Sequence, residues 1–369
     1  MVVGGGTPDT NNHKYWNGDI QWFTPSEIGR DKYVTNSLRT ISEEGLNKSS
    51  AKLLPIGTIL LSSRATVGEC SINKVECTTN QGFQSLIPKE NFSKEFVFYL
   101  MQTKRKELIR KSCGSTFLEI SANEVRKIKI AVPTSKEQEK ISKLLALLDE
   151  RISTQNKIIE DLKKLKYAIS KYLFERKDLF ENKIKLSKVA ELKNGYAFQS
   201  SKYNALGKWK ILTIANVAGE RYVKTNECNS IIEIPYDIQK HQKLEANDIL
   251  ISLTGNVGRV SLCTEGFFLL NQRVGLLQLK ISENREFIYQ VLSFHKFEES
   301  MIACAQGAAQ MNIGKGDVEN YILPYSFNKE NINSVASVLK NYDKYIINEI
   351  NMLSMLHSQK QYLLRQMFI

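Results

Sequence analysis

The chain repeats itself once, and this internal repeat constrains its fold more than any other feature. The segment at 54–68 reads LeuProIleGlyThrIleLeuLeuSerSerArgAlaThrValGly and returns at 244–258 as LeuGluAlaAsnAspIleLeuIleSerLeuThrGlyAsnValGly. Three more blocks recur in the same order, with an offset that grows only from 191 to 194: 80–83 with 271–274, 114–121 with 307–314, and 141–152 with 335–346. A period this long indicates duplicated domains and not a solenoid. We therefore expect a protein that performs one operation twice, on two similar but unequal targets.

The composition limits the class of protein. A chain of 369 residues has room for two or three domains with cores of their own. It has no run of 18 apolar residues and no secretory signal at its start, so we expect a cytoplasmic protein without a membrane partner. The six cysteines show no CxxC spacing, which argues against zinc and disulfides. The net charge of +12 favours a polyanionic partner such as nucleic acid.

Each copy reads as a mixed globular part followed by one long helix. Strands are expected at 18–24, 57–63, 83–88 and 125–132 in the first copy, and at 209–215, 248–253 and 274–279 in the second. Shorter helices are expected at 93–112 and 284–303. Short period-2 runs mixed with helices and interrupted by glycine and asparagine predict an α+β fold.

The two long helices carry heptad spacing. The expected seam residues are Leu145, Leu148, Ile152, Ile159, Leu162 and Ile169 in the first helix, and Leu339, Tyr342, Ile346, Leu353, Leu356 and Leu363 in the second. Polar residues interrupt both seams at matching places, Gln155 with Glu349 and Lys166 with Lys360, which specifies register. We expect the helices to pair antiparallel, as a ruler of roughly 57 Å, or roughly 17 base pairs of DNA.

The predicted architecture is therefore two homologous mixed α/β domains separated by a pair of long antiparallel coiled-coil helices, with pseudo-two-fold symmetry. The expected boundaries are 1–134 for the first globular domain, 135–182 for the first long helix, 183–325 for the second globular domain and 326–369 for the second long helix. The first copy lacks the opening strand that 183–189 provides in the second. Either the chain begins late or another segment supplies that strand.

These blocks, in this order and twice over, resemble a known family. The relevant stretches include GlyGlyGlyThrPro at 4–8, TrpPheThrProSerGluIle at 22–28, AsnGlnGlyPhe at 80–83 and AspIleLeuIleSerLeuThrGlyAsnValGly at 248–258. The family is the specificity (S) subunit of type I restriction–modification enzymes. The resemblance implies two target recognition domains, each reading one half of a split double-stranded DNA sequence. It also implies that the helices set the spacer and dock two methyltransferase (M) subunits, through which restriction (R) subunits join.

The residues themselves offer no catalytic site. No ProPro dipeptide and no GxxxxGK[ST] loop is present, so adenine methylation and ATP hydrolysis lack their motifs. The four histidines are isolated, so no catalytic or metal residue is predicted. AspGluArg at 149–151 is expected to make surface contacts on the helix. By the resemblance, S-adenosylmethionine, ATP and Mg²⁺ belong to partner subunits and this chain binds no cofactor itself.

Polar loops at matching places in both copies are the candidate DNA readers. Arg recognises guanine, Asn or Gln adenine, and the Thr methyl thymine. The candidates are Thr7, Thr24, Ser63, Arg64, Thr66, Asn80, Gln81, Lys104, Arg105, Ser115 and Thr116 in the first copy, and Thr254, Asn256, Arg259, Asn271, Gln272, Arg273 and Gln310 in the second. Those that differ between the copies are the better specificity candidates.

Several alternatives stay open at this stage. Asn80-Gln81 and Asn271-Gln272 are identical in both copies, so they could equally do a structural or phosphate-binding job. The basic run at 104–111 could be a solvated helix face. Trp22 and Trp209 are expected in the core. For the whole chain, the alternative is a coiled-coil adaptor that joins proteins without DNA specificity, while a self-sufficient nuclease or methyltransferase lacks its motifs.

Overall fold

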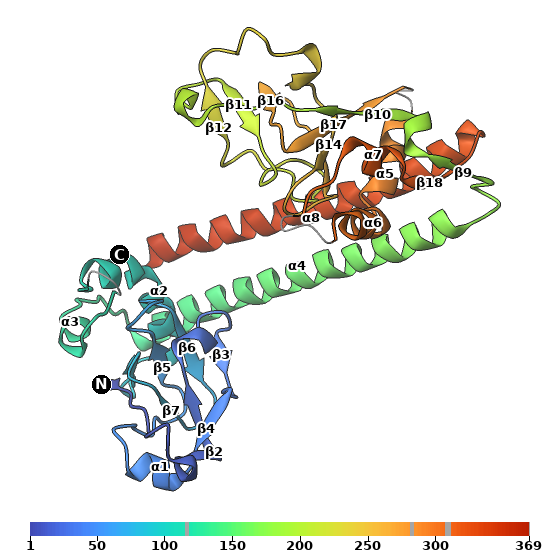
Figure 1. Ribbon diagram of the computed structural model, residues 1–369. Coiled ribbons are helices and arrows are strands. Elements are labelled where there is room, and N and C mark those ends of the chain that lie inside the picture. The colour runs from blue at the N-terminus through green and yellow to red at the C-terminus, as the bar shows by residue number, and fades with distance from the viewer. Residues whose placement is uncertain (115–117, 281–283, 307–310, 369) are drawn as a thin grey trace. The chain divides into compact units, whose positions relative to one another are not determined.

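Two compact units make up the part of the chain that the computed structural model describes, which is residues 1–114, 118–280, 284–306 and 311–368. The first unit is Met1–Asn156 with Met352–Ile369, and the second unit is Lys157–Asn351 (Figure 1). Each long helix therefore gives one part of its length to each unit.

The first unit contains two sheets. One is β1 (Val2–Gly4), β8 (Gln84–Leu86), β5 (Ile59–Leu61), β6 (Cys70–Asn73) and β3 (Tyr33–Val34), and the other is β4 (Arg39–Ile41), β2 (Trp16–Phe23) and β7 (Cys77–Thr79). Its short helices are α1 (Glu43–Asn47), α2 (Lys94–Arg110) and α3 (Ala122–Arg126), with 3-10 turns η1 (His13–Tyr15) and η2 (Pro25–Glu27). The side chain of Ser93 accepts from the Phe96 amide and caps α2, which packs over β5 and β6.

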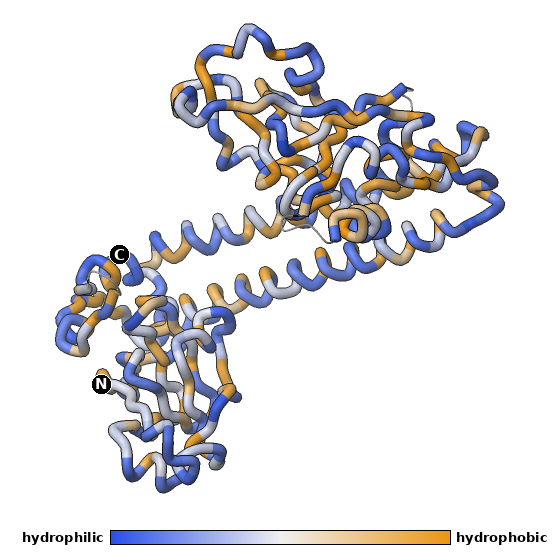
Figure 2. The backbone as a smooth tube through the Cα atoms, in the orientation of Figure 1, coloured by the Kyte–Doolittle hydropathy of each residue, from blue (hydrophilic) through white to orange (hydrophobic). Residues whose placement is uncertain are grey.

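The second unit repeats this plan with more strands. Its sheets are β10 (Ala190–Asn194), β17 (Val274–Leu279), β14 (Ile249–Ser252) and β15 (Val260–Leu262); β12 (Asn229–Ile231), β11 (Trp209–Leu212), β16 (Phe268–Leu270) and β13 (Lys243–Leu244); and β18 (Ile322–Tyr325) with β9 (Asn182–Lys185). Its short helices are α5 (Arg285–Leu292), α6 (His295–Ala305) and α7 (Lys315–Glu319), with 3-10 turns η3 (Leu186–Lys188), η4 (Ser200–Lys202) and η5 (Lys240–Gln242). In Figure 2 the apolar residues gather where the strands lie.

The long helices α4 (Ser135–Glu175) and α8 (Lys329–Met367) pack together. Every predicted seam residue is buried or half-buried, and Leu145 and Leu339 are fully buried. In the first unit Leu145 shares a cluster with Leu364, and in the second Ile169 packs against a cluster that holds Leu339. Residues later in α4 contact residues earlier in α8, so the helices are antiparallel in each unit. The predicted fold class is confirmed.

Two of the predicted polar interruptions, Lys166 and Lys360, form ion pairs between the two helices. In the first unit Lys360 Nζ lies 2.6 Å from Asp149 Oδ1. In the second unit Lys166 Nζ lies 2.6 Å from Asp343 Oδ1. The expectation that Asp149 makes surface contacts is therefore wrong, because its carboxylate faces a lysine of the other helix.

Two predicted elements differ from the structure. Residues 125–132 do not form a strand, because α3 ends at Arg126 and the residues after it pair with no strand. The described part of the first unit therefore has no counterpart of the β9–β18 pair of the second unit. The helix predicted at 284–303 is split into α5 and α6, because Phe294 takes an extended backbone and turns its ring to Phe174, 5.5 Å away. No helix in the described residues is long and apolar enough to cross a membrane.

Candidate nucleic-acid interface

Three loops far apart in the sequence converge in the second unit. They are 253–256 after β14, 270–273 before β17, and 311–314 before α7. The Leu253 amide donates to the Arg273 carbonyl at 3.0 Å, and the Ile313 amide donates to the Leu253 carbonyl at 2.9 Å. Backbone bonds therefore hold the three loops together and leave their side chains for other contacts.

The first unit builds the same frame from the equivalent loops 62–66, 79–82 and 118–120. The Ser63 amide donates to the Gly82 carbonyl at 2.8 Å, and the Ile120 amide donates to the Ser63 carbonyl at 3.0 Å. Ala65 and Gly255, at equivalent places, both take positive φ values of 57° and 71°. The three loop pairs that the repeat singled out thus lie together in each unit.

One position in this frame places different side chains on the same backbone. Arg64 and Glu119 face each other in an antiparallel bridge of the first unit, and Thr254 and Asn312 face each other in the equivalent bridge of the second. Arg64 Nε lies 2.8 Å from Glu119 Oε1, and both side chains are 44% exposed. The Thr254 hydroxyl is buried and has no hydrogen-bond partner among the described residues.

The candidates that are identical in both copies hold the loops in shape. The Asn80 side chain accepts from the Gly82 amide at 2.9 Å, and the Asn271 side chain accepts from the Arg273 amide at 3.1 Å. The two asparagines thus close the same turn. Their neighbours Gln81 and Gln272 are exposed, which separates a structural asparagine from an accessible glutamine.

The remaining candidates differ in accessibility. Asn256 and Arg273 are exposed, whereas Ser63 is fully buried. The Thr7 hydroxyl donates to Gln81. The hydroxyl of Thr24, the residue before η2, donates to Glu27. The Thr66 hydroxyl donates to Ser62, and Lys104 is half-buried on α2. Ser115, Thr116 and Gln310 lie outside the described residues.

Arg105 and Arg259 take part in one contact whose charges are reversed between the units. In the first unit Arg105 lies 3.0 Å from Glu69, and in the second Arg259 lies 3.4 Å from Glu298. Glu69 and Arg259 stand 190 residues apart, at matching places in the repeat. Each pair fastens the turn after a strand to the neighbouring helix, so both arginines have a structural partner.

A cavity of about 410 Å³ opens among the loops of the second unit. Its polar lining comes from Asn194, Thr254, Gln272, Asn312 and Lys315. Asn194, Asn312 and Lys315 were not among the predicted site residues. The signal for Asn312 was available, since it ends the block that matches 115–119; Lys315 and Asn194 lie outside the repeated blocks.

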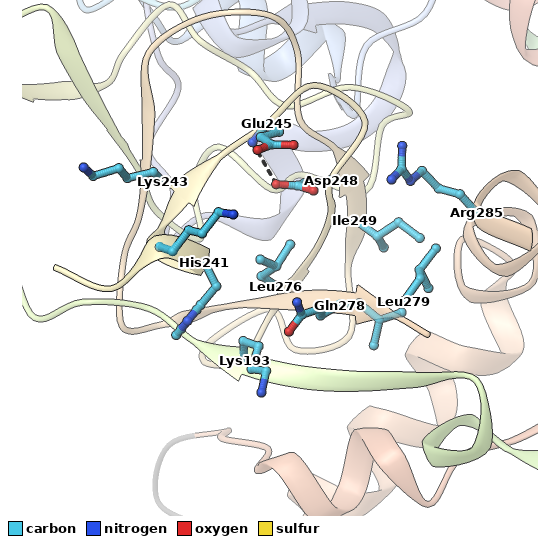
Figure 3. Close-up of a pocket in the computed structure, with 12 residues that line it drawn as sticks. Lys193, His241, Lys243, Glu245, Asp248, Ile249, Leu276, Gln278, Leu279 and Arg285 are labelled. Atoms are coloured by element: carbon cyan, nitrogen blue, oxygen red, sulfur yellow. Dashed lines mark hydrogen bonds between the residues drawn. The ribbon is translucent and has the colours of Figure 1, made fainter. Parts of the chain in front are cut away.

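A second cavity of about 430 Å³ in the same unit is rich in cations. Its lining includes Lys193, Lys240, His241, Lys243, Glu245, Asp248 and Arg285 (Figure 3). Lys193 precedes Asn194 on β10, so consecutive residues line the two cavities. The Glu245 amide donates to Asp248 at 2.8 Å, and burial raises the pKa of Asp248. In the described chain, no group of three or more His, Cys, Asp or Glu residues is placed to hold a metal ion.

The family of the chain is decided by a match across both copies. Residues 2–164 and 180–352 match the family model described as type I restriction modification DNA specificity domain. The chain belongs to this family. The resemblance predicted from the repeated blocks is confirmed, and the two matched regions coincide with the two copies.

Two specificity subunits are similar to about half of this chain. The chain is 37% identical over 185 residues to the type I restriction enzyme MjaIX specificity subunit of Methanocaldococcus jannaschii, covering 49% of this chain and 43% of that subunit. It is 30% identical over 185 residues to the EcoR124I/EcoR124II specificity subunit of Escherichia coli, covering 48% and 45%. Each alignment spans less than half the length of the relative.

The fold of the family extends over the whole chain. The crystal structure of the type I restriction–modification S subunit from M. genitalium superposes with a TM-score of 0.57, covering 98% of this chain and 99% of that one. The two sequences are only 16% identical, so this likeness concerns the fold.

Proposed function

We propose that the chain is the DNA-recognition subunit of a type I restriction–modification complex, with each globular domain reading one half of a bipartite target. The observation that carries this proposal is the pair of equivalent bridges, Arg64 with Glu119 and Thr254 with Asn312. The backbone is the same in both, but the side chains differ. Two domains that recognise different half-sites need the same backbone frame with different side chains.

The chemistry of these side chains suits base edges. An arginine donates to guanine, an asparagine pairs with adenine, a glutamate accepts from the cytosine amino group, and a threonine methyl contacts thymine. Arg64 and Glu119 are both 44% exposed, so their mutual ion pair leaves them within reach of a ligand. Exposed Gln81, Gln272 and Arg273 extend the same surface.

Phosphate contacts are proposed to come from cationic residues of the same globular domains. Lys193, Lys240, Lys243 and Arg285 line one cavity of the second unit, and the chain carries a net charge of +12. Phosphate contacts position a protein on the duplex while base contacts specify the sequence. The presence of a cationic cavity and a polar one in the same unit fits this division.

The outer faces of the long helices are proposed to dock two methyltransferase subunits, which bring in the restriction subunits. Apolar residues recur away from the seam at intervals of seven residues, or of fourteen between the first two: Leu144, Ile158, Leu165 and Tyr172 on α4, and Val338, Tyr345 and Met352 on α8. All seven are exposed, and exposed apolar stripes of this kind indicate protein interfaces. The chain itself is proposed to do no chemistry. S-adenosylmethionine, ATP and Mg²⁺ would belong to the partners, and the DNA substrate puts the complex in the cytoplasm.

The test exchanges the bridge residues of the first domain for those of the second. The double variant Arg64→Thr with Glu119→Asn is co-expressed with the methyltransferase subunit of the system, and methylated adenines are mapped by single-molecule sequencing. We expect the wild type to give a split motif. The variant should change one position of one half-site and leave the other half-site intact.

A matched control removes another exposed ion pair of the first unit. Lys127 and Glu124 lie 2.6 Å apart on and just after α3, and Lys127→Thr with Glu124→Asn should leave the motif unchanged. An unchanged motif in the bridge variant would show that these residues do not read bases. If the wild type forms no complex, gives no motif and does not bind DNA at low salt, the adaptor function takes its place.

A further inference from the structure

Each globular domain meets the long helices at an ionic cluster, half-buried in the first unit and more deeply buried in the second, and the two clusters occupy equivalent places in the repeat. The first joint consists of Lys32, Tyr99, Asp149 and Lys360, all in the first unit. The second joint consists of Lys166, Arg221, Glu286, Gln290 and Asp343, all in the second unit. Asp149 and Asp343 are 194 residues apart, and so are Lys166 and Lys360. One contact has therefore been built twice.

In the first joint, a carboxylate is shared between the domain and the opposite helix. Asp149 Oδ1 accepts from Lys360 of α8 at 2.6 Å. Asp149 Oδ2 accepts from the Tyr99 hydroxyl of α2 at 2.6 Å. Burial and the neighbouring carboxylate raise the pKa of Tyr99, so its phenol stays protonated and donates. Lys32 completes the joint, 3.1 Å from the Tyr99 oxygen.

The second joint divides its carboxylate in the same way. Asp343 Oδ1 accepts from Lys166 of α4 at 2.6 Å. Asp343 Oδ2 accepts from Arg221 at 2.8 Å and from Gln290 of α5 at 2.6 Å. Arg221 also makes a two-pronged contact with Glu286, at 2.7 and 2.8 Å. The side chains of Arg221 and Asp343 are only 8% and 9% exposed.

These ionic contacts fix the register of the two helices, which the apolar seam alone does not determine. A heptad seam presents similar apolar residues after a slip of seven positions, whereas a single buried polar pair does not. Charge-assisted hydrogen bonds are strong and directional, and a buried charge that loses its partner is costly. Because each aspartate bonds to its domain with one oxygen and to the opposite helix with the other, it holds the domain against both helices together.

We propose that the two joints are positioning residues that set the spacer between the two half-sites, an inference that rests on the proposed function. The loops that read bases lie on the globular domains, and the joints hold those domains to the helices. Loosening a joint therefore leaves the bases that are read unchanged and widens the range of spacers that are accepted.

The test uses Tyr99→Phe in the first joint and Arg221→Lys in the second, each in the full chain co-expressed with the methyltransferase subunit. Tyr99→Phe deletes only the hydroxyl that bonds to Asp149, and Arg221→Lys keeps the charge but loses the two-pronged geometry. Methylated adenines are then mapped. Methylation at sites whose spacer is one base pair longer or shorter should rise about tenfold over wild type, the effect of losing one or two hydrogen bonds. Both half-site sequences should stay the same.

Two matched variants distinguish positioning from a general loss of stability. Ile41→Val and Ile231→Val each delete one methyl group from a buried cluster of the first or second unit, away from the joints. They should lower stability without admitting new spacers. A single unchanged spacer in active joint variants, or equal widening in the isoleucine variants, would overturn the proposal. If the wild type itself shows no split motif, the recognition function fails first and the joints lose their role with it.

Discussion

The two joints share one ion pair but surround it with different partners. In the first unit the domain reaches its aspartate with Tyr99, a neutral phenol. In the second it does so with Arg221, a cation that is also bound to Glu286. The aspartate–lysine contact between the helices is the same 2.6 Å in both. The contact between helices is thus the same in both units, while the domain side supplies a different donor to the second carboxylate oxygen.

The largest expected effect comes from removing the carboxylate charge in each joint. Asp343→Asn leaves the buried cations Arg221 and Lys166 without their shared partner, and we expect it to lower the free energy of unfolding by about 3–5 kcal/mol. Asp149→Asn affects one lysine and one neutral hydroxyl, with an expected cost of about 1–3 kcal/mol. Urea unfolding of both variants measures the difference. An equal or larger loss for Asp149→Asn would contradict the distinction between the joints.

A smaller difference is expected at two equivalent glycines. Gly68 and Gly258 have φ values of 85° and 79°, where a side chain costs about 1–2 kcal/mol. An added Cβ at Gly68 would lie 2.8 Å from Arg105 Cγ, on an exposed side chain that can move. At Gly258 it would lie 2.7 Å from Cβ of Met301, which is buried.

We therefore expect Gly258→Ala to cost about 1–3 kcal/mol more than Gly68→Ala, because overpacking adds to the backbone strain. Thermal unfolding of the two variants under the same conditions gives the comparison. If the two midpoints fall by the same amount, the packing around the two turns is equivalent after all.

The smallest effect concerns the ion pair whose charges are reversed between the units. Glu69→Arg places two arginines face to face in the first unit, and adding Arg105→Glu restores a pair of the second unit's polarity. A double-mutant cycle should give a coupling of about 0.2–1 kcal/mol, as for other exposed pairs. Its magnitude is read from urea unfolding of the two single variants and the double variant. Zero coupling would mean that the observed contact contributes nothing.

Much of the architecture could be predicted because the same sequence patterns occur in both copies. The heptads of 145–169 and 339–363 specified both helices, and their burial agrees residue by residue. The order of the repeated blocks predicted which loops correspond between the copies, since duplicated segments build the same frame. Asn80 and Asn271 were left open between structure and recognition, and their turn-closing bonds support the structural role.

The parts that could not be predicted depend on contacts distant in the sequence. In the sequence, Asp149 has the pattern of an exposed helical carboxylate. Only the fold places Lys360 and Tyr99 beside it. Residues 125–132 have strand-like composition, but a strand also needs a neighbour to pair with. Phe294 interrupts a run that reads as one helix, because its ring packs on a residue 120 positions earlier. In each case the tertiary partner outweighs the local pattern.

The reversed ion pair also bears on how such a chain can recombine with itself. A crossover that joined the first copy up to Glu69 with the second copy from its helix onward would set Glu69 against Glu298, and the reciprocal product would set Arg259 against Arg105. Both products carry like charges at a turn that their parents hold closed. Breakpoints outside this interval keep each pair intact. Exchange of the whole segment from this turn through its helix therefore keeps the ion pair, whereas a crossover inside the segment replaces a small attraction with a repulsion.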